Sequence, residues 1–337
     1  MINIQRNYPL KHYNSFGLEA TAQLFIETNE SQELFNTLNS YNIDLNNLFV
    51  LGTGSNVLLK EPLLQTVIHP VNTDFGVIEE TNDSVLVKCG AGKNWDEFVE
   101  WTVDNGYGGL ENLSYIPGSV GAAPIQNIGA YGAEVSLCLE SVSVIDLSTC
   151  QQFMVSRDKC RFGYRDSIFK EPTHKHWLIW EVYFLLDKDP RINLSYTPLK
   201  KEFPIGYFPG IQEVRKAVIR LRQSKLPDPI ELGNAGSFFK NPVVSACNAS
   251  LLQEKHPEMP TYYHEPGTVK IGAGWLIEQC GWKGFREGQV GVYPRQALVL
   301  VNYGGASADE LLNLAGSIVE SVKKTFGIKL ETEVRIL

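Results

Sequence analysis

The chain has 337 residues, of which 43% are hydrophobic, 20% charged and 11% aromatic, so collagen-like, low-complexity and disordered classes are excluded. Its length corresponds to two or three domains. The formal net charge of −8 argues against nucleic acid or an anionic membrane as the main partner, although a local basic pocket could still bind a small phosphorylated ligand.

The first sixty residues contain a strand followed by a short glycine-rich loop. Residues 1–17 show neither the apolar core nor the cleavage site of a signal peptide, so no export is expected. Leu48–Leu51 predicts a strand, and Gly52–Asn56 (GTGSN) follows it directly. A Rossmann fingerprint would need a third small residue where Val57 stands, so that fold is not expected. The loop fits an anion-binding nest and a plain tight turn equally well.

A second glycine-rich segment lies at residues 108–134, after a predicted strand at 84–89 and a predicted helix. Asn94 and Glu97 resemble the capping box that begins such a helix, and Asn105-Gly106 would end it. The segment 108–134 carries almost no charge, which favours backbone pressed closely against a ligand or another chain segment. Within it, the amides of Gln126 and Asn127 could bind the edge of a heterocycle. The alternative is a closely packed buried loop.

The middle of the chain combines a charged motif, a buried strand and a basic helix. Cys160–Lys170 (CRFGYRDSIFK) contains Arg165, for which a structural Arg–Asp pair is the alternative to a functional role. His174 and His176 lie in a turn with Pro and Lys, and no metal site is expected. Trp177–Leu186 is too short to span a bilayer and predicts a buried strand. Ile211–Lys225 predicts an amphipathic helix.

The last hundred residues predict a second module. Pro residues after position 225 end the basic helix and indicate a domain boundary. Ser237 has neither a GxSxG elbow nor a His within eighteen residues, so a hydrolase nucleophile is disfavoured. Ser307 and Glu310 form a capping box for an apolar-striped helix that ends at Gly327, and alternation over 328–336 predicts a terminal strand. The six cysteines form no CxxC pair, which favours free thiols in a reducing cytoplasm.

Taken in order, eight segments of the chain closely resemble the UDP-N-acetylenolpyruvoylglucosamine reductase (UDP-N-acetylmuramate dehydrogenase) family, flavoenzymes of peptidoglycan precursor synthesis. The segments are NSFGLEA at 14–20, LGTGSNVLL at 51–59, GLENLSYIPGSVGAAPIQNIGAYG at 109–132, CRFGYRDSIFK at 160–170, KLPDP at 225–229, GNAGSFFKNP at 233–242, AGWLIEQCGWKG at 273–284 and LETEVRI at 330–336.

The resemblance implies a fold and an activity. The fold would be α+β in three parts: two FAD-clasping α+β subdomains (1–67 plus 327–337, and 68–226) and a substrate-binding α+β domain (227–326), with a PCMH-type FAD-binding region at about 17–188. The enzyme would hold FAD non-covalently and use NADPH to reduce UDP-N-acetylglucosamine enolpyruvate to UDP-N-acetylmuramate in the cytoplasm. We expect no nucleic acid, membrane, metal or obligate protein partner.

The resemblance also implies roles for single residues. Arg165 and Glu333 would polarise the substrate, and Ser237 would donate a proton. Without the family match, Glu333 would be interpreted as a solvated strand-face residue. The implied FAD contacts are Gly54, Ser55, Asn56, Ile116, Pro117, Gly118, Ala122, Gln126, Ile128, Gly129, Ile179, Arg222 and Arg335. The implied substrate contacts are Tyr196, Lys225, Asn241 and Gln296. Tyr196 lies in an insertion typical of the type that closes a tyrosine loop over the substrate.

Two other functions remain open from the sequence. One is another flavin oxidoreductase on the same scaffold, such as an oxidase of small alcohols. That enzyme would lack the Ser237, Arg165 and Glu333 set and the cation for the UDP phosphates. The other is a flavin- or nucleotide-binding module without catalysis. Bleaching of the bound flavin by NADPH, followed by reoxidation with the enolpyruvyl substrate, distinguishes all three.

Overall fold

The computed structural model describes residues 2–41, 43–61 and 65–337 of the chain. These residues form two compact units, each assembled from separate stretches of sequence. The first unit comprises the described residues of 1–8, 21–54 and 64–222, and the second those of 9–20, 55–63 and 223–337. Both units combine helices with sheets that contain antiparallel and parallel pairings, so the predicted α+β class is confirmed.

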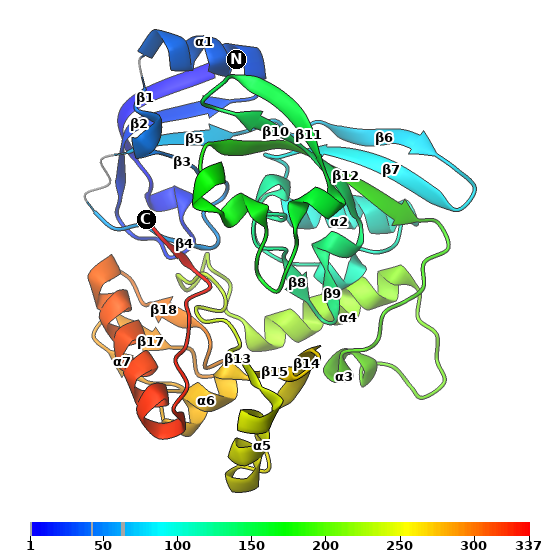
Figure 1. The fold of residues 1–337 in the computed structure, drawn as a ribbon, viewed down its shortest axis with the longest axis vertical. Helices are drawn as coiled ribbons and strands as arrows, with labels where there is room; N and C mark the ends of the chain where they lie inside the picture. The colour runs from blue at the N-terminus through cyan, green and yellow to red at the C-terminus, as the bar shows by residue number, and fades with distance from the viewer. Residues whose placement is uncertain (1, 42, 62–64) are drawn as a thin grey trace. The chain divides into compact units, whose positions relative to one another are not determined.

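The first unit contains a four-stranded sheet, in the order β1-β2-β5-β3, and a five-stranded antiparallel sheet, in the order β11-β10-β12-β7-β6 (Figure 1). Its strands are β1 (Ile2–Pro9), β2 (Thr21–Thr28), β3 (Leu48–Val50), β5 (Thr66–Pro70), β6 (Phe75–Glu80), β7 (Ser84–Gly90), β8 (Gly129–Ala130), β9 (Ala133–Glu134), β10 (Leu139–Asp146), β11 (Gln151–Ser156) and β12 (Trp177–Asp187). Its helices are α1 (Ser31–Tyr41), α2 (Trp95–Asp104), α3 (Thr197–Lys200) and α4 (Ile211–Lys225), the last three residues of α4 belonging to the second unit.

Strand β12 is the predicted apolar run, and it occupies the centre of the five-stranded sheet. Val182 is paired with Val142 of β10 on one side and with Cys89 of β7 on the other, and all three side chains are fully buried. Trp95 and Phe98 of helix α2 join the same core. Leu178, Ile179 and Trp180 are buried in succession, which explains the continuous apolar run at the start of β12, whereas burial alternates from Glu181 to Asp187 and Leu185 is 45% exposed.

Helix α2 begins where its sequence predicts. The Asn94 side chain caps the helix by accepting the N–H of Glu97 at 3.1 Å. The Glu97 carboxylate pairs with Lys93, so the described residues show the Asn94 cap without a closed capping box. Helix α4 occupies the range predicted for the basic helix, Ile211–Lys225, and its apolar residues up to Val218 are buried.

The second unit is built from short strands and three helices of its own. Its strands are β4 (Val57–Leu58), β13 (Val243–Ser245), β14 (Thr261–Glu265), β15 (Thr268–Ile271), β16 (Arg286–Glu287), β17 (Val290–Val292), β18 (Leu300–Asn302) and β19 (Arg335–Ile336). Its helices are α5 (Ala246–Lys255), α6 (Ala273–Gln279) and α7 (Ala308–Phe326).

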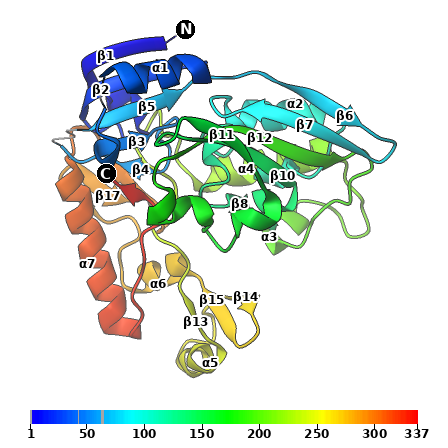
Figure 2. The same cartoon turned by 45° about the horizontal axis from the view of Figure 1, so that its top comes forward.

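Helix α7 lies along the β16-β17-β18 sheet and buries its apolar stripe there (Figure 2). Both hydrogen bonds of the predicted capping box are present between Ser307 and Glu310. Gly327 ends the helix with a φ of 70°, a conformation that a glycine adopts without steric cost. The predicted start, face and end of this helix are therefore confirmed.

The chain's last segment differs from the predicted terminal strand. Ile328, Leu330 and Val334 are buried as the alternation requires, but only Arg335–Ile336 form a strand, β19, and Ile336 is 45% exposed. The reason is the partner: β4 offers only Val57 and Leu58 for parallel pairing. The alternation of apolar and polar residues therefore predicted which side chains face the core, but it did not predict how many residues pair as a strand.

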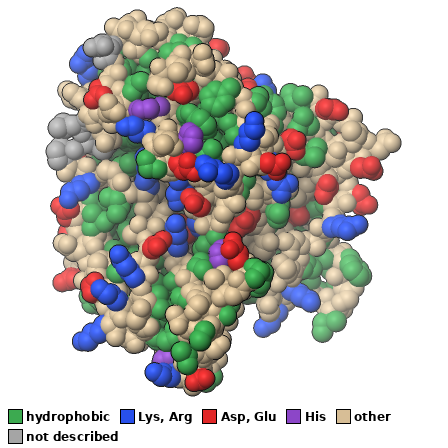
Figure 3. All heavy atoms as spheres, viewed as in Figure 1, with side chains coloured by type: hydrophobic (Ala, Val, Ile, Leu, Met, Phe, Trp, Pro, Cys, Tyr) green, Lys and Arg blue, Asp and Glu red, His purple; other side chains and the backbone are tan. Residues whose placement is uncertain are grey.

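The outer surface agrees with the mixed composition. On the face drawn in Figure 3, acidic and basic side chains are interspersed. Across 2–41, 43–61 and 65–337, none of the helices is long and apolar enough to cross a membrane.

Candidate active site

The first glycine loop, residues 52–56, contributes close backbone approach rather than side-chain chemistry. Gly54 has a φ of 69°, a left-handed conformation that favours glycine. A Cβ at Gly52 would lie 2.6 Å from the Ser119 hydroxyl oxygen. This loop therefore packs against the second glycine loop, residues 108–134. Ser55 and Asn56 belong to the second unit.

The second glycine loop is pressed against the segment between β7 and α2. The Gly121 N–H donates to the Ala91 carbonyl at 2.9 Å, and a Cβ at Gly121 would lie 2.5 Å from the Ala91 Cβ. Gly118 has a φ of 148°, and its carbonyl accepts the N–H of Trp95 at 3.0 Å. The close backbone packing predicted for this uncharged segment is confirmed.

The remaining predicted FAD contacts of the first unit lie on this loop or beside it. Ala122 lies in the 3-10 turn Val120–Ala122, and Gln126 follows in the next turn. Ile128 and Ile179 are buried, the latter on β12, and Gly129 begins β8.

Asn127 corrects one sequence expectation. Its amide nitrogen donates to Glu134 at 2.8 Å and to the Gly163 carbonyl at 3.1 Å, while its oxygen accepts the N–H of Ser136. The amide that seemed suited to bind a heterocycle is thus used to fasten the loop from within. The sequence could not distinguish an amide that binds a ligand from one that fastens the loop, because both would be a buried amide beside glycine.

Arg165 reaches the second glycine loop. Its Nη2 donates to the carbonyl of Gly129 at 2.7 Å, which joins a predicted catalytic residue to a predicted FAD contact. Its own backbone has a φ of 55°, an unfavourable conformation for a residue with a Cβ. The guanidinium lies 5.5 Å from the centre of the Tyr164 ring. These contacts orient the side chain toward the loop.

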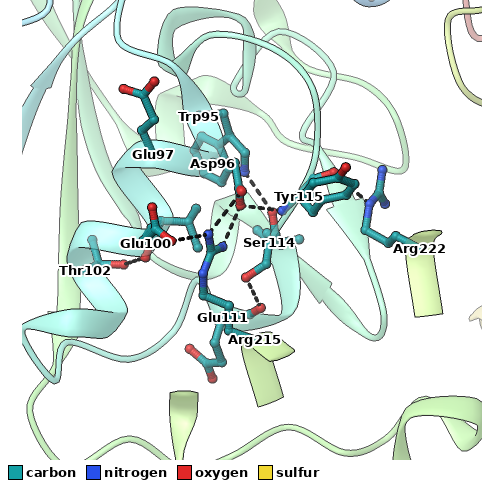
Figure 4. Close-up of polar contacts among 12 residues, drawn as sticks. Trp95, Asp96, Glu97, Glu100, Thr102, Glu111, Ser114, Tyr115, Arg215 and Arg222 are labelled. Atoms are coloured by element: carbon teal, nitrogen blue, oxygen red, sulfur yellow. Dashed lines mark hydrogen bonds and ion pairs between the residues drawn. The ribbon is translucent and has the colours of Figure 1, made fainter. Parts of the chain in front are cut away.

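A group of four residues holds the second glycine loop at Tyr115, just before the predicted FAD contacts at 116–118, and sequence analysis missed three of them. We call it the Tyr115 clamp: Asp96, Tyr115, Arg215 and Arg222 (Figure 4). The Tyr115 N–H donates to Asp96 Oδ1 at 2.5 Å, and the Tyr115 carbonyl accepts Nε of Arg222 at 2.9 Å. Arg215 forks onto both Asp96 oxygens at 2.6 and 3.1 Å. No spacing in the sequence links these positions.

The electrostatics of the clamp depend on its two arginines. Burial acts to lower the pKa of Arg215, but hydrogen bonds and charge from Asp96 and Glu100 outweigh it and raise that pKa. Desolvation lowers the pKa of Arg222, opposed by the charge of Tyr131 and Asp96. A desolvated cation of this kind gains when an anion binds beside it.

In the second unit, two of the three predicted catalytic residues lie on paired backbone segments. The Glu333 N–H donates to the Phe238 carbonyl at 2.8 Å, and the Lys240 N–H donates to the Glu331 carbonyl at 2.9 Å. Ser237 directly precedes Phe238 and forms a bridge with Val299. Ser237 and Glu333 are therefore held by neighbouring stretches of one small ladder, both partly buried.

Two predicted FAD contacts of the second unit, Asn56 and Arg335, lie beside the segment that contains Glu333. The Asn56 amide donates to the Glu333 carbonyl at 3.3 Å, and the Arg335 N–H donates to the Asn56 carbonyl at 3.1 Å. The parallel pairing of β19 with β4 explains this proximity. Arg165, by contrast, belongs to the first unit.

The predicted substrate contacts fall into two groups. Tyr196 lies in the first unit, where its ring packs edge-on against Tyr131 with centroids 5.3 Å apart. Lys225 ends helix α4. Asn241 and Gln296 lie in the second unit, near the start of α6: Asn241 Oδ1 accepts the N–H of Ala273 at 2.9 Å. Gln296 Oε1 accepts the N–H of Leu298 at 3.3 Å, so both amides also have local structural partners.

These residues fit a flavin dinucleotide in chemical terms. Gly54 and Gly118 have positive φ, a backbone conformation found in anion-binding loops and favoured by glycine. The Arg222 Nε is taken by Tyr115, and within the described ranges neither of its Nη groups has a protein acceptor. A desolvated guanidinium beside glycine-rich backbone suits a pyrophosphate.

Comparisons with known proteins agree with this architecture. Residues 228–337 match the family model described as UDP-N-acetylenolpyruvoylglucosamine reductase, C-terminal domain, and residues 22–150 match a FAD binding domain. The chain is 44% identical to the UDP-N-acetylenolpyruvoylglucosamine reductase of Flavobacterium johnsoniae, with 100% of each chain covered. It is 42% identical to that of Pseudomonas aeruginosa, with 98% of each covered. The crystal structure of this reductase from Thermus caldophilus superposes with a TM-score of 0.69 at 25% identity, covering 100% and 99% of the two chains.

Proposed function

This chain belongs to the UDP-N-acetylenolpyruvoylglucosamine reductase family, and from that premise we propose that Ser237, Arg165 and Glu333 carry its reaction. The protein is a flavin-dependent oxidoreductase of peptidoglycan precursor synthesis. It uses FAD and NADPH to reduce the enolpyruvyl double bond of UDP-N-acetylglucosamine enolpyruvate, which yields UDP-N-acetylmuramate.

The reaction adds one hydride and one proton across a carbon–carbon double bond. Bound FAD supplies the chemistry that passes a hydride from NADPH to the methylene carbon of the substrate. Negative charge then develops on the neighbouring carbon and on the carboxylate attached to it. Fixed cations and hydrogen-bond donors in a site that excludes water stabilise such charge best.

Arg165 would bind the substrate carboxylate. A guanidinium carries five N–H donors in a planar fork that matches a carboxylate. The bond from its Nη2 to the Gly129 carbonyl supports this role, because it anchors the side chain at the predicted flavin loop. Glu333 would assist from the second unit as a hydrogen-bonding partner of the developing charge, provided that it holds a proton.

Ser237 would give its hydroxyl proton to the carbon next to the carboxylate and then regain a proton from solvent. A serine is a weak acid, but a carbanion-like centre is basic enough to accept its proton, and such a transfer typically contributes about a hundred- to ten-thousand-fold. The ladder that holds Ser237 beside the segment of Glu333 is the observation that best supports this assignment.

The test separates the two half-reactions in the variant Ser237→Ala. Stopped-flow bleaching by NADPH should proceed at the parent rate, because flavin reduction needs no proton from Ser237. Reoxidation by the enolpyruvyl substrate should slow by about a hundredfold or more, because protonation is lost while substrate still binds.

Ser237→Cys provides the matched comparison. A thiol has similar reach and is the stronger acid, so this variant should recover part of the reoxidation rate. If Ser237→Ala reoxidises as fast as the parent enzyme, another group donates the proton. If both half-reactions slow equally, Ser237 is a packing residue of the Gly-Phe-Phe turn.

Three finer statements belong to the same proposal. The substrate would be gripped through its UDP moiety by Tyr196, Lys225, Asn241 and Gln296, with Tyr196 on a closing loop. The enzyme would work in the cytoplasm, in keeping with cysteines that are all free in the described chain. Residues 1–67 with 327–337, and residues 68–226, would form the two subdomains that bind FAD, and residues 227–326 would bind the substrate. The enzyme would need no protein partner.

A further inference from the structure

The Tyr115 clamp connects helix α4 to the loop that is expected to bind FAD. Tyr115 immediately precedes Ile116, Pro117 and Gly118 in the chain. Its backbone has a φ of 60°, which an ordinary L residue rarely adopts unless surrounding contacts impose it. Both polar groups of this residue's backbone are bound, the N–H by Asp96 and the carbonyl by Arg222. The clamp therefore fixes the direction of the second glycine loop at Tyr115, just before residues 116–118.

Within the described part of the chain, Arg215 contacts Asp96 and Glu100, so it reaches the loop through Asp96. Its side chain is only 9% exposed, against 25% for Asp96, so the forked pair between them is shielded from solvent. Two parallel N–H···O bonds fix the plane of the carboxylate, and Oδ1 of that carboxylate is the acceptor for Tyr115. Glu100 also touches Arg215 at 3.3 Å, but it is 59% exposed, and the backbone of Tyr115 is bonded to Asp96 and Arg222 instead.

The two arginines of the clamp lie seven residues apart on α4, which is close to two helical turns, so they project from one face. The charge of Asp96 acts on Arg222 as well. With Arg215 in place, both Asp96 oxygens are engaged in the forked pair. Without Arg215, that carboxylate would compete with an anionic cofactor for the Arg222 guanidinium.

We propose that Asp96 and Arg215 are positioning residues for FAD, which set the backbone of Tyr115 and keep the Arg222 guanidinium available for the cofactor's pyrophosphate. This inference rests on the proposed FAD contacts of residues 116–118 and Arg222. It assigns to Asp96 and Arg215 an effect on cofactor retention, and neither residue touches the reacting atoms.

The experiment measures how fast the holoenzyme releases FAD, followed as the rise in flavin fluorescence after dilution. Arg215→Met should release FAD about tenfold faster than the parent, because a charge-assisted hydrogen-bond pair that orients the loop is lost. Arg215→Lys should show a smaller acceleration, because a lysine keeps the charge but not the fork. Glu100→Gln is the matched control and should release FAD at the parent rate.

A double variant tests whether Arg215 acts through Asp96. Asp96→Asn alone should accelerate release, and the combined Asp96→Asn and Arg215→Met change should accelerate it no more than the stronger single change, rather than by the product of the two. A product of the two effects would show independent roles and overturn the proposal. Arg215→Lys also serves if Arg215→Met fails to fold.

Remaining outcomes are decisive. Release at the parent rate in Arg215→Met and Asp96→Asn, even with lowered melting temperatures, would reduce the clamp to a stability role and overturn the inference. Acceleration in Glu100→Gln equal to that in Arg215→Met would overturn it as well. A parent enzyme that carries no releasable FAD would instead contradict the proposed function, so the two failures are distinguishable.

Discussion

Backbone conformation at single residues indicates where this molecule is under local constraint. Tyr115, Asn127, Tyr131 and Arg165 all have positive φ, and all four lie in or contact the second glycine loop. Each such residue costs about 1–2 kcal/mol relative to an ordinary conformation, so the surrounding hydrogen bonds must hold it. Strain of this kind gathers at functional sites, which agrees with the sites proposed for FAD and substrate.

The basic residue at the end of α4 offers a residue-scale prediction. Lys225→Ala should raise KM for the UDP-sugar substrate about ten- to a hundredfold with kcat little changed, because a cation that pairs with a pyrophosphate contributes roughly 1.5–3 kcal/mol. Steady-state kinetics with varied substrate measure this. Lys216→Ala, an exposed lysine of the same helix, should leave KM unchanged. An unaltered KM in Lys225→Ala would remove that residue from the substrate site.

At the scale of elements, the packing of the second glycine loop decides where its backbone lies. The turn Val120–Ala122 approaches β7 and α2 so closely that position 121 has no room for a methyl group, since the Ala91 Cβ would be 2.5 Å away. Helix α4 fixes the same loop at Tyr115, because Arg222 donates to the Tyr115 carbonyl. Two elements far apart in sequence thus determine one loop conformation.

Gly121→Ala should displace this loop and weaken FAD binding. The added methyl group meets backbone-anchored atoms that cannot rotate away, and such overpacking typically costs about 1–3 kcal/mol. The FAD content after gel filtration and the rate of FAD release should both report the loss. Gly76→Ala, on strand β6, has open space around the new methyl group and should retain FAD as the parent does. Full FAD retention in Gly121→Ala would contradict the tight packing described.

For the whole molecule, the decisive feature is that each unit has a core of its own. The first is centred on the five-stranded sheet with α2, and the second on α7 with its short strands. Predicted catalytic residues occur in both units, with Arg165 in the first and Ser237 and Glu333 in the second. A cofactor that binds the folded chain and not the unfolded one would stabilise it by mass action.

The whole-molecule prediction concerns how FAD is held. The purified enzyme should be yellow, and acid precipitation should release all of the flavin into the supernatant, because the glycine loops offer backbone hydrogen bonds but no histidine for a covalent link. Absorption of the supernatant and pellet measures this. A pellet that stays yellow would show covalent attachment.

Local elements and the family could be predicted from the amino-acid sequence. Ser307 and Glu310 predict the start of helix α7, Gly327 predicts its end, and the spacing of its apolar residues predicts its buried face. These signals can be recognised in sequence because capping and periodicity depend on residues only a few positions apart. The eight family segments identified the activity. The exact use of single polar side chains was less accessible: Asn127 fastens its own loop instead of facing outward, and the final alternation produced only a two-residue strand.

Only the tertiary structure decided which distant residues meet. Asp96, Tyr115 and Arg215 carry no motif, yet α2, the flavin loop and α4 bring them into one network. Ser237 and Glu333 are likewise joined through the Phe238 carbonyl, across almost a hundred residues of chain. Periodicity and capping act within a few residues along the chain, whereas these contacts arise from burial and pairing between elements that the sequence does not place side by side.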